Sequence, residues 1–118
     1  MAGLTTHVLD IVKGGPAQRM RVELYEFDPG GARKLIADVV TNVDGRTDAP
    51  LIAAPDARVG YFELVFHAGD YFRKIGAKLA DPPFLDIVPI RFAVADPAVH
   101  YHVPLLVSPW SYSTYRGS

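Results

Sequence analysis

The sequence from residue 61 to residue 67, Tyr61-Phe62-Glu63-Leu64-Val65-Phe66-His67, decides the fold class. In an extended chain, Phe62, Leu64 and Phe66 fall on one side and the residues between them fall on the other. Alternation with a period of two is typical of a strand that buries one face. The segment therefore predicts a β-strand with its aromatic side in a core and its other side, which ends in His67, at the surface.

The same alternation continues on both sides of this segment. Met20, Val22 and Leu24 form an apolar face in the same way. Further strands are expected over residues 34–43, 86–95 and 99–107. Ten glycines and ten prolines stand between the apolar runs. Because these two residue types interrupt regular structure at turns, the pattern favours an all-β domain.

A single helix is expected near residues 70–79, where the period of two is lost. Tyr71, Ile75 and Leu79 recur at every fourth position, which is typical of one helix face. Asp70 precedes them and has the side chain of a helix cap. The prolines after Asp81 end the helix, because proline has no amide hydrogen to donate. These elements together predict an antiparallel β-sandwich with one short helix.

The composition is that of one domain, residues 1–118, with a core of ordinary size. Hydrophobic residues make up 49% and charged residues 21% of the chain, and a chain of this length buries roughly two-thirds of its surface. Twelve basic and thirteen acidic side chains give a net charge of −1, so no basic excess indicates a nucleic acid or an anionic membrane as a partner. The chain has no cysteine, which excludes disulfides and thiolate chemistry.

The amino-terminal segment, residues 1–7, has neither a basic flank nor the apolar core of a signal peptide. No run in the sequence approaches the roughly 20 apolar residues that span a bilayer. We therefore expect a cytoplasmic protein with no membrane partner.

Two histidines, His100 and His102, share one face of the strand expected over residues 99–107. The alternate residues are expected to face the core: Val99, Tyr101, Val103 and Leu105. The pair can be solvated surface histidines, two ligands of a metal ion, or acid/base groups that titrate near neutral pH. The residues alone leave these alternatives open, since no third metal ligand is evident.

Two further side chains, His7 and Arg46, are candidates in other segments. His7 faces outward if Leu4 and Val8 anchor the first strand. Arg46 follows an Asp-Gly turn, where a guanidinium can bind a carbonyl or an anion through paired hydrogen bonds. On their own, His7 is better explained as a structural or solvated residue, and Arg46 as a solvated loop charge.

The sequence ends in Tyr115-Arg116-Gly117-Ser118, which places a phenol, a guanidinium and a hydroxyl close together. Trp110 and Tyr112 precede this tetrapeptide and are expected to be packing residues. Serine nucleophile chemistry has little support, because the Gly-x-Ser-x-Gly motif is absent. A phosphate-binding loop and a dinucleotide fingerprint are also absent, so no nucleotide cofactor is expected.

Three separated segments together resemble the 5-hydroxyisourate hydrolases, a family related to transthyretin. They are Leu4-Thr5-Thr6-His7-Val8-Leu9-Asp10, Thr41-Asn42-Val43-Asp44-Gly45-Arg46-Thr47, and His100-Tyr101-His102-Val103-Pro104-Leu105-Leu106 with the terminal tetrapeptide. The resemblance implies an eight-stranded β-sandwich with one short helix, assembled as a homotetramer, a dimer of dimers, around a central channel. It also implies hydrolysis of 5-hydroxyisourate to 2-oxo-4-hydroxy-4-carboxy-5-ureidoimidazoline in urate breakdown, with water as second substrate and no metal or cofactor.

The resemblance also implies roles for individual residues. His7, Arg46 and His102 match the active-site positions of the family, and His7 and His102 would activate water by acid/base chemistry. Substrate contacts are expected from His7, Arg46, His100, Tyr115 and Arg116, and Ser118 is expected to take part in catalysis. Two other classes of protein compete with this interpretation: a hormone carrier like transthyretin, and a His-x-His metal-binding module.

Overall fold

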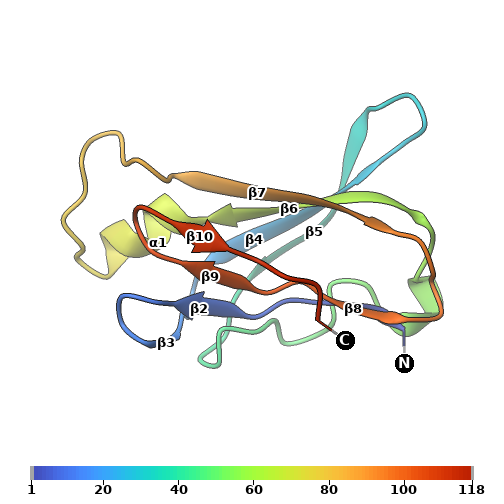
Figure 1. Ribbon diagram of the computed structural model, residues 1–118, viewed down its shortest axis with the longest axis horizontal. Helices are drawn as coiled ribbons and strands as arrows, with labels where there is room; N and C mark the ends of the chain where they lie inside the picture. Colours follow the sequence, from blue (N-terminus) through green and yellow to red (C-terminus); the bar gives the residue numbers. More distant parts are fainter. Residues whose placement is uncertain (1, 118) are drawn as a thin grey trace.

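Two layers of β-sheet face each other in the computed structural model, which describes residues 2–117 (Figure 1). Strands supply most of the regular structure, and one short α-helix, α1, lies at one end of the sandwich (Figure 1). The described segment begins and ends in the half of the molecule opposite α1 (Figure 1). The predicted all-β class is therefore confirmed.

The first layer is a four-stranded antiparallel sheet with the order β5-β4-β6-β7. Its strands are β4 (Arg21–Phe27), β5 (Arg33–Val40), β6 (Gly60–His67) and β7 (Ile87–Val94). The strands predicted over residues 20–25, 61–67 and 86–95 are thus confirmed. The strand predicted over residues 34–43 ends earlier, at Val40, because the pairing of β5 with β4 ends there.

The second layer consists of shorter strands and contains two parallel pairs. In the sheet β10-β9-β2-β3, strand β2 (Val8–Asp10) runs parallel to β9 (Leu105–Val107). Beside it, β1 (Gly3–Thr5) runs parallel to β8 (His100–His102). The outer strands are antiparallel to their neighbours: β3 (Gly15–Pro16) and β10 (Tyr112–Ser113). The expectation of a wholly antiparallel sandwich is therefore wrong for these two pairs.

The strand expected over residues 99–107 is interrupted at Val103 and Pro104. Pro104 has no amide hydrogen for the ladder, and the Val103 carbonyl accepts a hydrogen bond of 2.7 Å from the Thr6 hydroxyl. The segment that pairs with it is interrupted at the corresponding position, between β1 and β2. When each interrupted strand is counted once, residues 2–117 form eight strands, as the resemblance implied. A short 3-10 helix, η1 (Ala54–Asp56), completes the regular structure.

The core lies between the two layers and contains the predicted aromatic face of β6. Phe62, Leu64 and Phe66 are fully buried, and each side chain of this size contributes roughly 1.5–3 kcal/mol when removed from water. The predicted apolar face of β4 is buried with them: Met20, Val22 and Leu24. Leu4 and Val8 are also buried, so they anchor the first two strands as expected. The core therefore follows directly from the period of two in the sequence.

Three apolar side chains expected to pack are instead exposed. Val99 is 38% exposed because it precedes β8 rather than belonging to it. Trp110 is 66% exposed, and Tyr112 is exposed as well. Trp110 lies in the bend between β9 and β10, where the Ser108 hydroxyl accepts hydrogen bonds from the backbone N–H groups of Trp110 and Ser111. The bend turns the indole outward, away from the core.

Helix α1 (Ala68–Lys74) begins and ends earlier than the predicted residues 70–79. Its buried stripe is formed by Ala68, Tyr71 and Phe72, at the spacing i, i+3, i+4, whereas Ile75 is 54% exposed. Gly76 ends it with a φ of +86°, a conformation that glycine adopts readily. The side chain of Asp70 lies in the first turn and does not cap the helix. Within residues 2–117, no helix has the length and apolar character needed to cross a membrane.

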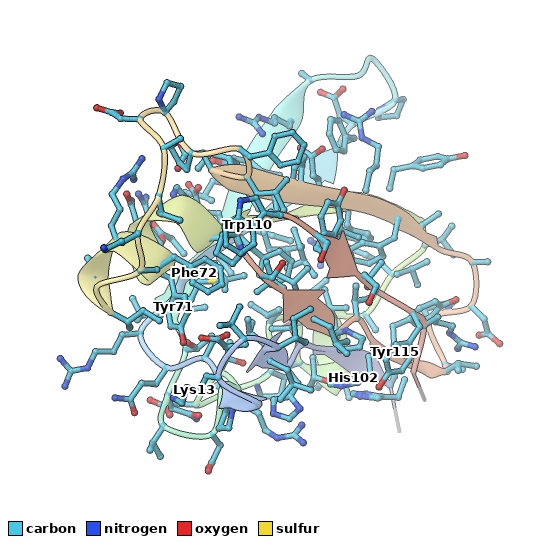
Figure 2. The ribbon with its side chains drawn as sticks, turned by 60° about the vertical axis from the view of Figure 1, so that its left-hand side comes forward. Lys13, Tyr71, Phe72, His102, Trp110 and Tyr115 are labelled. Carbon is cyan, nitrogen blue, oxygen red and sulfur yellow. The ribbon has the colours of Figure 1, made fainter. Side chains whose placement is uncertain are left out.

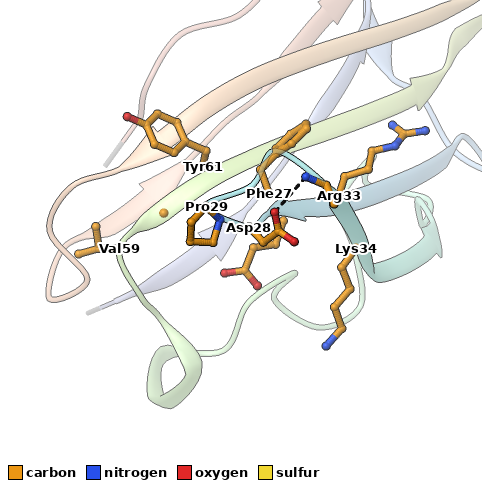
Figure 3. Close-up of a pocket in the computed structure, with 10 residues that line it drawn as sticks. Phe27, Asp28, Pro29, Arg33, Lys34, Val59 and Tyr61 are labelled. Carbon is orange, nitrogen blue, oxygen red and sulfur yellow. Dashed lines mark hydrogen bonds between the residues drawn. The ribbon is translucent and has the colours of Figure 1, made fainter.

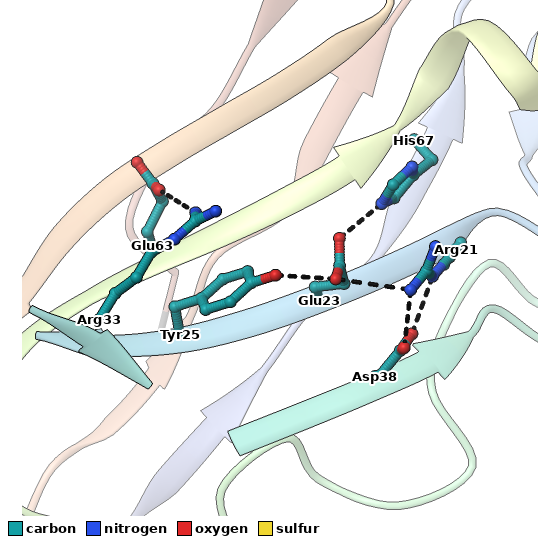
Figure 4. Close-up of polar contacts among 7 residues, drawn as sticks. All are labelled: Arg21, Glu23, Tyr25, Arg33, Asp38, Glu63 and His67. Carbon is teal, nitrogen blue, oxygen red and sulfur yellow. Dashed lines mark hydrogen bonds and ion pairs between the residues drawn. The ribbon is translucent and has the colours of Figure 1, made fainter. Parts of the chain in front are cut away.

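His67, predicted to be a surface residue, is half-buried on the outer side of the first sheet. Its Nε2 donates to Glu23 Oε1 at 2.6 Å, and the two side chains are only 15% and 12% exposed. The Tyr25 hydroxyl donates to the other Glu23 oxygen at 2.8 Å, and Arg21 binds Asp38 beside it (Figure 4). The hydrogen bond from His67, and then that from Tyr25, hold the pKa of Glu23 below its usual value of 4.5.

We predict that Glu23→Gln lowers the free energy of unfolding at pH 7 by about 1.5–3 kcal/mol, the range for hydrogen bonds to a charged group. Because the pKa of Glu23 is lowered in the folded state, its stabilisation is present above its unfolded pKa and lost as the pH falls through the folded pKa. Urea unfolding at pH 7 and at pH 3 measures the difference.

The matched control is Asp38→Asn, which breaks an exposed ion pair on the same face. That change is expected to alter stability less than Glu23→Gln does, because solvent screens an exposed pair. A Glu23→Gln protein as stable as the wild type at pH 7 would contradict the prediction.

Candidate functional site

Arg46 is brought beside His7 by a tight turn over residues 42–45. The Asn42 side chain accepts hydrogen bonds from the backbone N–H groups of Asp44 and Arg46, at 2.9 and 3.2 Å. Gly45 has a φ of +73°, and a Cβ there would collide with the carbonyl oxygen of Val8. Only glycine fits such a close approach of two backbones. The turn thus pairs Arg46 with His7 in an isolated antiparallel bridge.

The imidazole of His7 is oriented by the same turn. Its Nε2 lies 2.9 Å from the backbone carbonyl oxygen of Asp44. A carbonyl oxygen only accepts hydrogen bonds, so His7 Nε2 carries a hydrogen and donates it. His7 is half-buried and Arg46 is exposed, which leaves the guanidinium open to a ligand.

His100 and His102 both face Thr5, which lies on the neighbouring strand β1. The register of β1 and β8 places Thr5 directly opposite His102. The Thr5 hydroxyl oxygen lies 2.9 Å from His100 Nε2 and 2.9 Å from His102 Nδ1. The two histidines therefore share a face, as the alternation predicted. They are half-buried and hydrogen-bonded rather than fully solvated.

The carboxy-terminal segment returns to His102. The backbone N–H of Gly117 donates to the His102 carbonyl at 2.6 Å, and the His102 N–H donates to the Gly117 carbonyl at 3.3 Å. A Cβ at position 117 would lie 3.0 Å from His102 Cδ2, closer than carbon atoms pack without strain. Glycine therefore allows the last described residue to lie against the imidazole.

The side chains of the tail point in different directions. The guanidinium of Arg116 lies over the ring of Tyr101, with its carbon 4.5 Å from the ring centre, at the distance of a cation–π contact. Tyr115 is exposed and lies in the same part of the molecule as His102, far from Tyr71 and Phe72 (Figure 2). Ser118, a predicted catalytic residue, lies outside the described residues.

Burial lowers the pKa of His102 below its ordinary value of 6.5, and the charge of Arg46 lowers it further. His7 and His100 act in the same direction when they are protonated. These three side chains come from three separate segments, and all of them are close enough to His102 to affect its charge. The structure thus brings His7, Arg46 and His100 to His102, and the lowered pKa favours the neutral form of His102 at pH 7.

The gathered groups can perform acid/base chemistry beside a fixed positive charge. No set of three His, Asp or Glu side chains within residues 2–117 is arranged to bind a metal ion. A separate pocket lies between the β4–β5 turn and the start of β6, with Phe27, Pro29, Arg33 and Tyr61 in its wall (Figure 3). It contains none of the predicted site residues.

Sequence reasoning did not single out Thr5 or Asn42. Thr5 alternates with His7 along the first strands and so belongs on the same face, a signal that was present in the sequence. Asn42 begins an Asn-x-Asp-Gly turn, in which an asparagine side chain commonly bonds the backbone two residues on. The contact of Thr5 with two histidines 95 and 97 residues away had no local signal.

Comparison with known proteins gives the same family from sequence and from structure. The chain is 58% identical to 5-hydroxyisourate hydrolase 2 of Rhizobium meliloti over 98% of this chain and 95% of that protein. It is 52% identical to the 5-hydroxyisourate hydrolase of Pseudomonas aeruginosa over all of this chain and 93% of that protein.

Solved structures share the fold over the whole chain. The 5-hydroxyisourate hydrolase of Klebsiella pneumoniae is 33% identical, with a TM-score of 0.80 and full coverage of both chains. The transthyretin of Sparus aurata is 27% identical, with a TM-score of 0.87 over 99% of this chain and 97% of that one. An (S)-allantoin synthase structure is 46% identical, with a TM-score of 0.93, and this chain spans 44% of its length. The family model described as the HIUase/Transthyretin family matches residues 4–117, and the chain belongs to that family.

Proposed function

We propose that this chain hydrolyses 5-hydroxyisourate to 2-oxo-4-hydroxy-4-carboxy-5-ureidoimidazoline in urate degradation. One observation carries the proposal: His7 pairs with Arg46 and His102 pairs with Gly117 in isolated bridges, and both His7 and Arg46 lie close enough to His102 to lower its pKa. Named hydrolases of the family with high identity over the whole chain support the substrate. We take residues 1–118 as a single hydrolase domain.

The proposed reaction is attack of water on a ring carbonyl, followed by cleavage of the adjacent C–N bond. One histidine removes a proton from water, and the other orients or stabilises the reacting group. The exposed guanidinium of Arg46 binds the substrate and stabilises the negative charge that forms on the carbonyl oxygen. Two imidazoles and a fixed cation are sufficient for this chemistry, so we propose that it proceeds without metal or cofactor.

The terminal tetrapeptide has two proposed roles. The contact of Arg116 with Tyr101 supports a role in holding the tail, which places Tyr115 near the substrate. Gly117 lies against His102, so Ser118 follows immediately after the residue that touches the imidazole. We propose that Ser118 and Tyr115 position substrate or water by hydrogen bonding. We also propose that His100, on the same strand as His102, supports the site.

We further propose that the protein is a homotetramer, a dimer of dimers. Exposed apolar side chains support self-association, because a monomeric protein rarely leaves several large ones together in contact with water. Val12, Ile75 and Trp110 are all more than half exposed and line one groove with Lys13 and Lys78. The cytoplasmic location expected from the sequence stays a prediction.

The first test is the ultraviolet decay of 5-hydroxyisourate generated from urate by urate oxidase. We expect this protein to accelerate the decay equally with and without prior chelator treatment. His102→Asn and His7→Asn are each expected to reduce turnover by at least about a hundredfold, the usual contribution of acid/base groups. His67→Asn, remote from the site, is the control for the loss of an imidazole. No acceleration by the folded wild type would reject the hydrolase and favour a carrier of small ligands.

The second test concerns the tail. A few residues added after Ser118 are expected to reduce turnover by about tenfold or more, since displaced active-site groups can reduce rates by up to about a hundredfold. The same residues added before Met1 serve as the control. Light scattering checks that both proteins keep the mass of the wild type. Full activity of the carboxy-terminal extension at that mass would contradict a role for the tail.

The third test is the titration of His102. By NMR its midpoint is expected below pH 6.5, because burial and Arg46 disfavour the protonated ring. Arg46→Gln is expected to raise that midpoint, whereas Arg116→Gln, whose guanidinium lies on Tyr101, leaves it unchanged. Since the unfolded chain binds this proton more readily, the lowered pKa also reduces folded-state stability as the pH falls through 6.5. A midpoint at or above 6.5 would contradict the burial of His102.

A further inference from the structure

One hydroxyl group, that of Thr5, joins the two imidazoles of β8. Thr5 Oγ1 lies 2.9 Å from both His100 Nε2 and His102 Nδ1. A hydroxyl has one hydrogen to donate and can accept from other donors. The direction of this hydrogen-bond chain therefore depends on which ring nitrogens carry hydrogens.

The second ring nitrogen of His100 decides the direction. His100 Nδ1 is buried and has no hydrogen-bond partner among residues 2–117. Buried N–H groups without an acceptor are the rarest unpaired groups in folded proteins, and acceptors without a donor are less rare. His100 therefore keeps Nδ1 free of hydrogen, carries its hydrogen on Nε2 and donates it to Thr5.

The Thr5 hydroxyl then donates to His102 Nδ1, and a neutral His102 carries its hydrogen on Nε2. The reverse direction would place a hydrogen on the buried His100 Nδ1. If both histidines donated to Thr5, the hydroxyl hydrogen would have no acceptor among the described residues. The hydrogen bonds therefore run from His100 to Thr5 and from Thr5 to His102. Only in this direction do the His100 Nε2 hydrogen and the Thr5 hydroxyl hydrogen both have an acceptor, while the buried His100 Nδ1 carries no hydrogen.

His7 is held in the complementary state. Its Nε2 donates to the Asp44 carbonyl at 2.9 Å, so in the neutral ring Nδ1 has a lone pair. Within residues 2–117, no donor hydrogen-bonds to that nitrogen. One histidine of the site thus offers an N–H and the other a lone pair.

We propose that Thr5 and His100 are positioning residues that fix His102 as a neutral hydrogen-bond donor through Nε2, and that His7 Nδ1 accepts the proton of the attacking water. The inference rests on the proposed function and divides its chemistry between the two histidines. His102 then binds the carbonyl oxygen together with Arg46 and does not change its protonation state. Its lowered pKa supports this role, because a neutral ring is needed.

Each step conserves protons and electron pairs. As the water oxygen bonds to the carbonyl carbon, one water proton moves to His7 Nδ1 and the π electrons move onto the carbonyl oxygen. That oxygen accepts hydrogen bonds from His102 Nε2 and Arg46. The carbonyl then re-forms, the C–N bond breaks, and the proton on His7 Nδ1 passes to the leaving nitrogen. His7 returns to its starting state.

The groups that face His102 include only one hydrogen-bond partner that could fix its tautomer. Thr5 faces it from β1, and His100 lies two residues away on β8. His7 and Arg46 approach from the bridge between their segments, and Gly117 covers the ring with backbone. Of these, only Thr5 is hydrogen-bonded to His102 Nδ1 in the described chain.

Long-range proton–nitrogen NMR spectra read the tautomer of His102 directly. In the wild-type tetramer we expect the hydrogen on Nε2. Thr5→Val removes the hydroxyl at nearly constant volume and is expected to give a mixture of tautomers, whereas Thr5→Ser restores the wild-type state. Thr6→Val is the matched control, because Thr6 bonds the Val103 carbonyl instead; it is expected to lower the melting temperature and leave the tautomer unchanged.

Turnover gives a second readout. Thr5→Val is expected to lower kcat by about tenfold or more with little change in KM, and Thr5→Ser to recover most of it, because acid/base and donor groups act mainly in the transition state. His102→Gln, whose amide can donate near the position of Nε2, is expected to retain more activity than His102→Asn. By contrast, the His7→Gln and His7→Asn variants are expected to be equally inactive.

Two results would overturn the inference. The first is a hydrogen on Nδ1 of neutral His102 in the wild-type protein. This measurement does not depend on the folding of any variant. The second is an unchanged tautomer in folded Thr5→Val. Failure of the proposed function would be seen separately, as no acceleration of 5-hydroxyisourate decay by the folded wild type, and would leave the tautomer measurement valid.

Discussion

The parallel pairing of β1 with β8 is the constraint on which the site depends. It joins residues 3–5 to residues 100–102, nearly the whole length of the chain apart, in one fixed register. That register sets Thr5 opposite His102, and the interruption at Thr6 and Pro104 lets the same two segments continue as β2 and β9. Loop closure over so many residues is unfavourable in entropy, so the pairing requires the core beneath it. Leu4, Val8, Val103 and Leu105 provide that core from the same segments.

Much of the first sheet could be predicted because its signal is local. Alternation in β4, β6 and β7 requires only that one face be apolar, and Phe62, Leu64 and Phe66 satisfy this within five residues. The pair of histidines on one face followed from the same rule. The direction of pairing did not, because parallel and antiparallel neighbours present the same alternation. The parallel pairs β1–β8 and β2–β9 depend on contacts that no short segment encodes.

The helix and the exposed aromatic residues were mispredicted for a related reason. The apolar spacing of Tyr71, Ile75 and Leu79 matched a helix, but the buried stripe uses Ala68, Tyr71 and Phe72. The Tyr71 hydroxyl donates to the buried carboxylate of Asp10, and the backbone N–H of Gly69 donates to the Asp86 carbonyl. These tertiary contacts decide where the helix begins, and local propensity is too weak to oppose them. For His67, the missing information was its partner Glu23, which lies 44 residues away.

The two sheets of this sandwich have separate outer faces, and the polar network around Glu23 belongs entirely to the first. The charged network thus lies on the first sheet, while the outer face of the other sheet carries His7, His100 and His102. Substitutions on that second face can change its chemistry while the charged network and the core stay intact. A scaffold divided in this way can host a binding surface in one lineage and a reactive one in another. The transthyretin and hydrolase structures that share this fold are consistent with such a history.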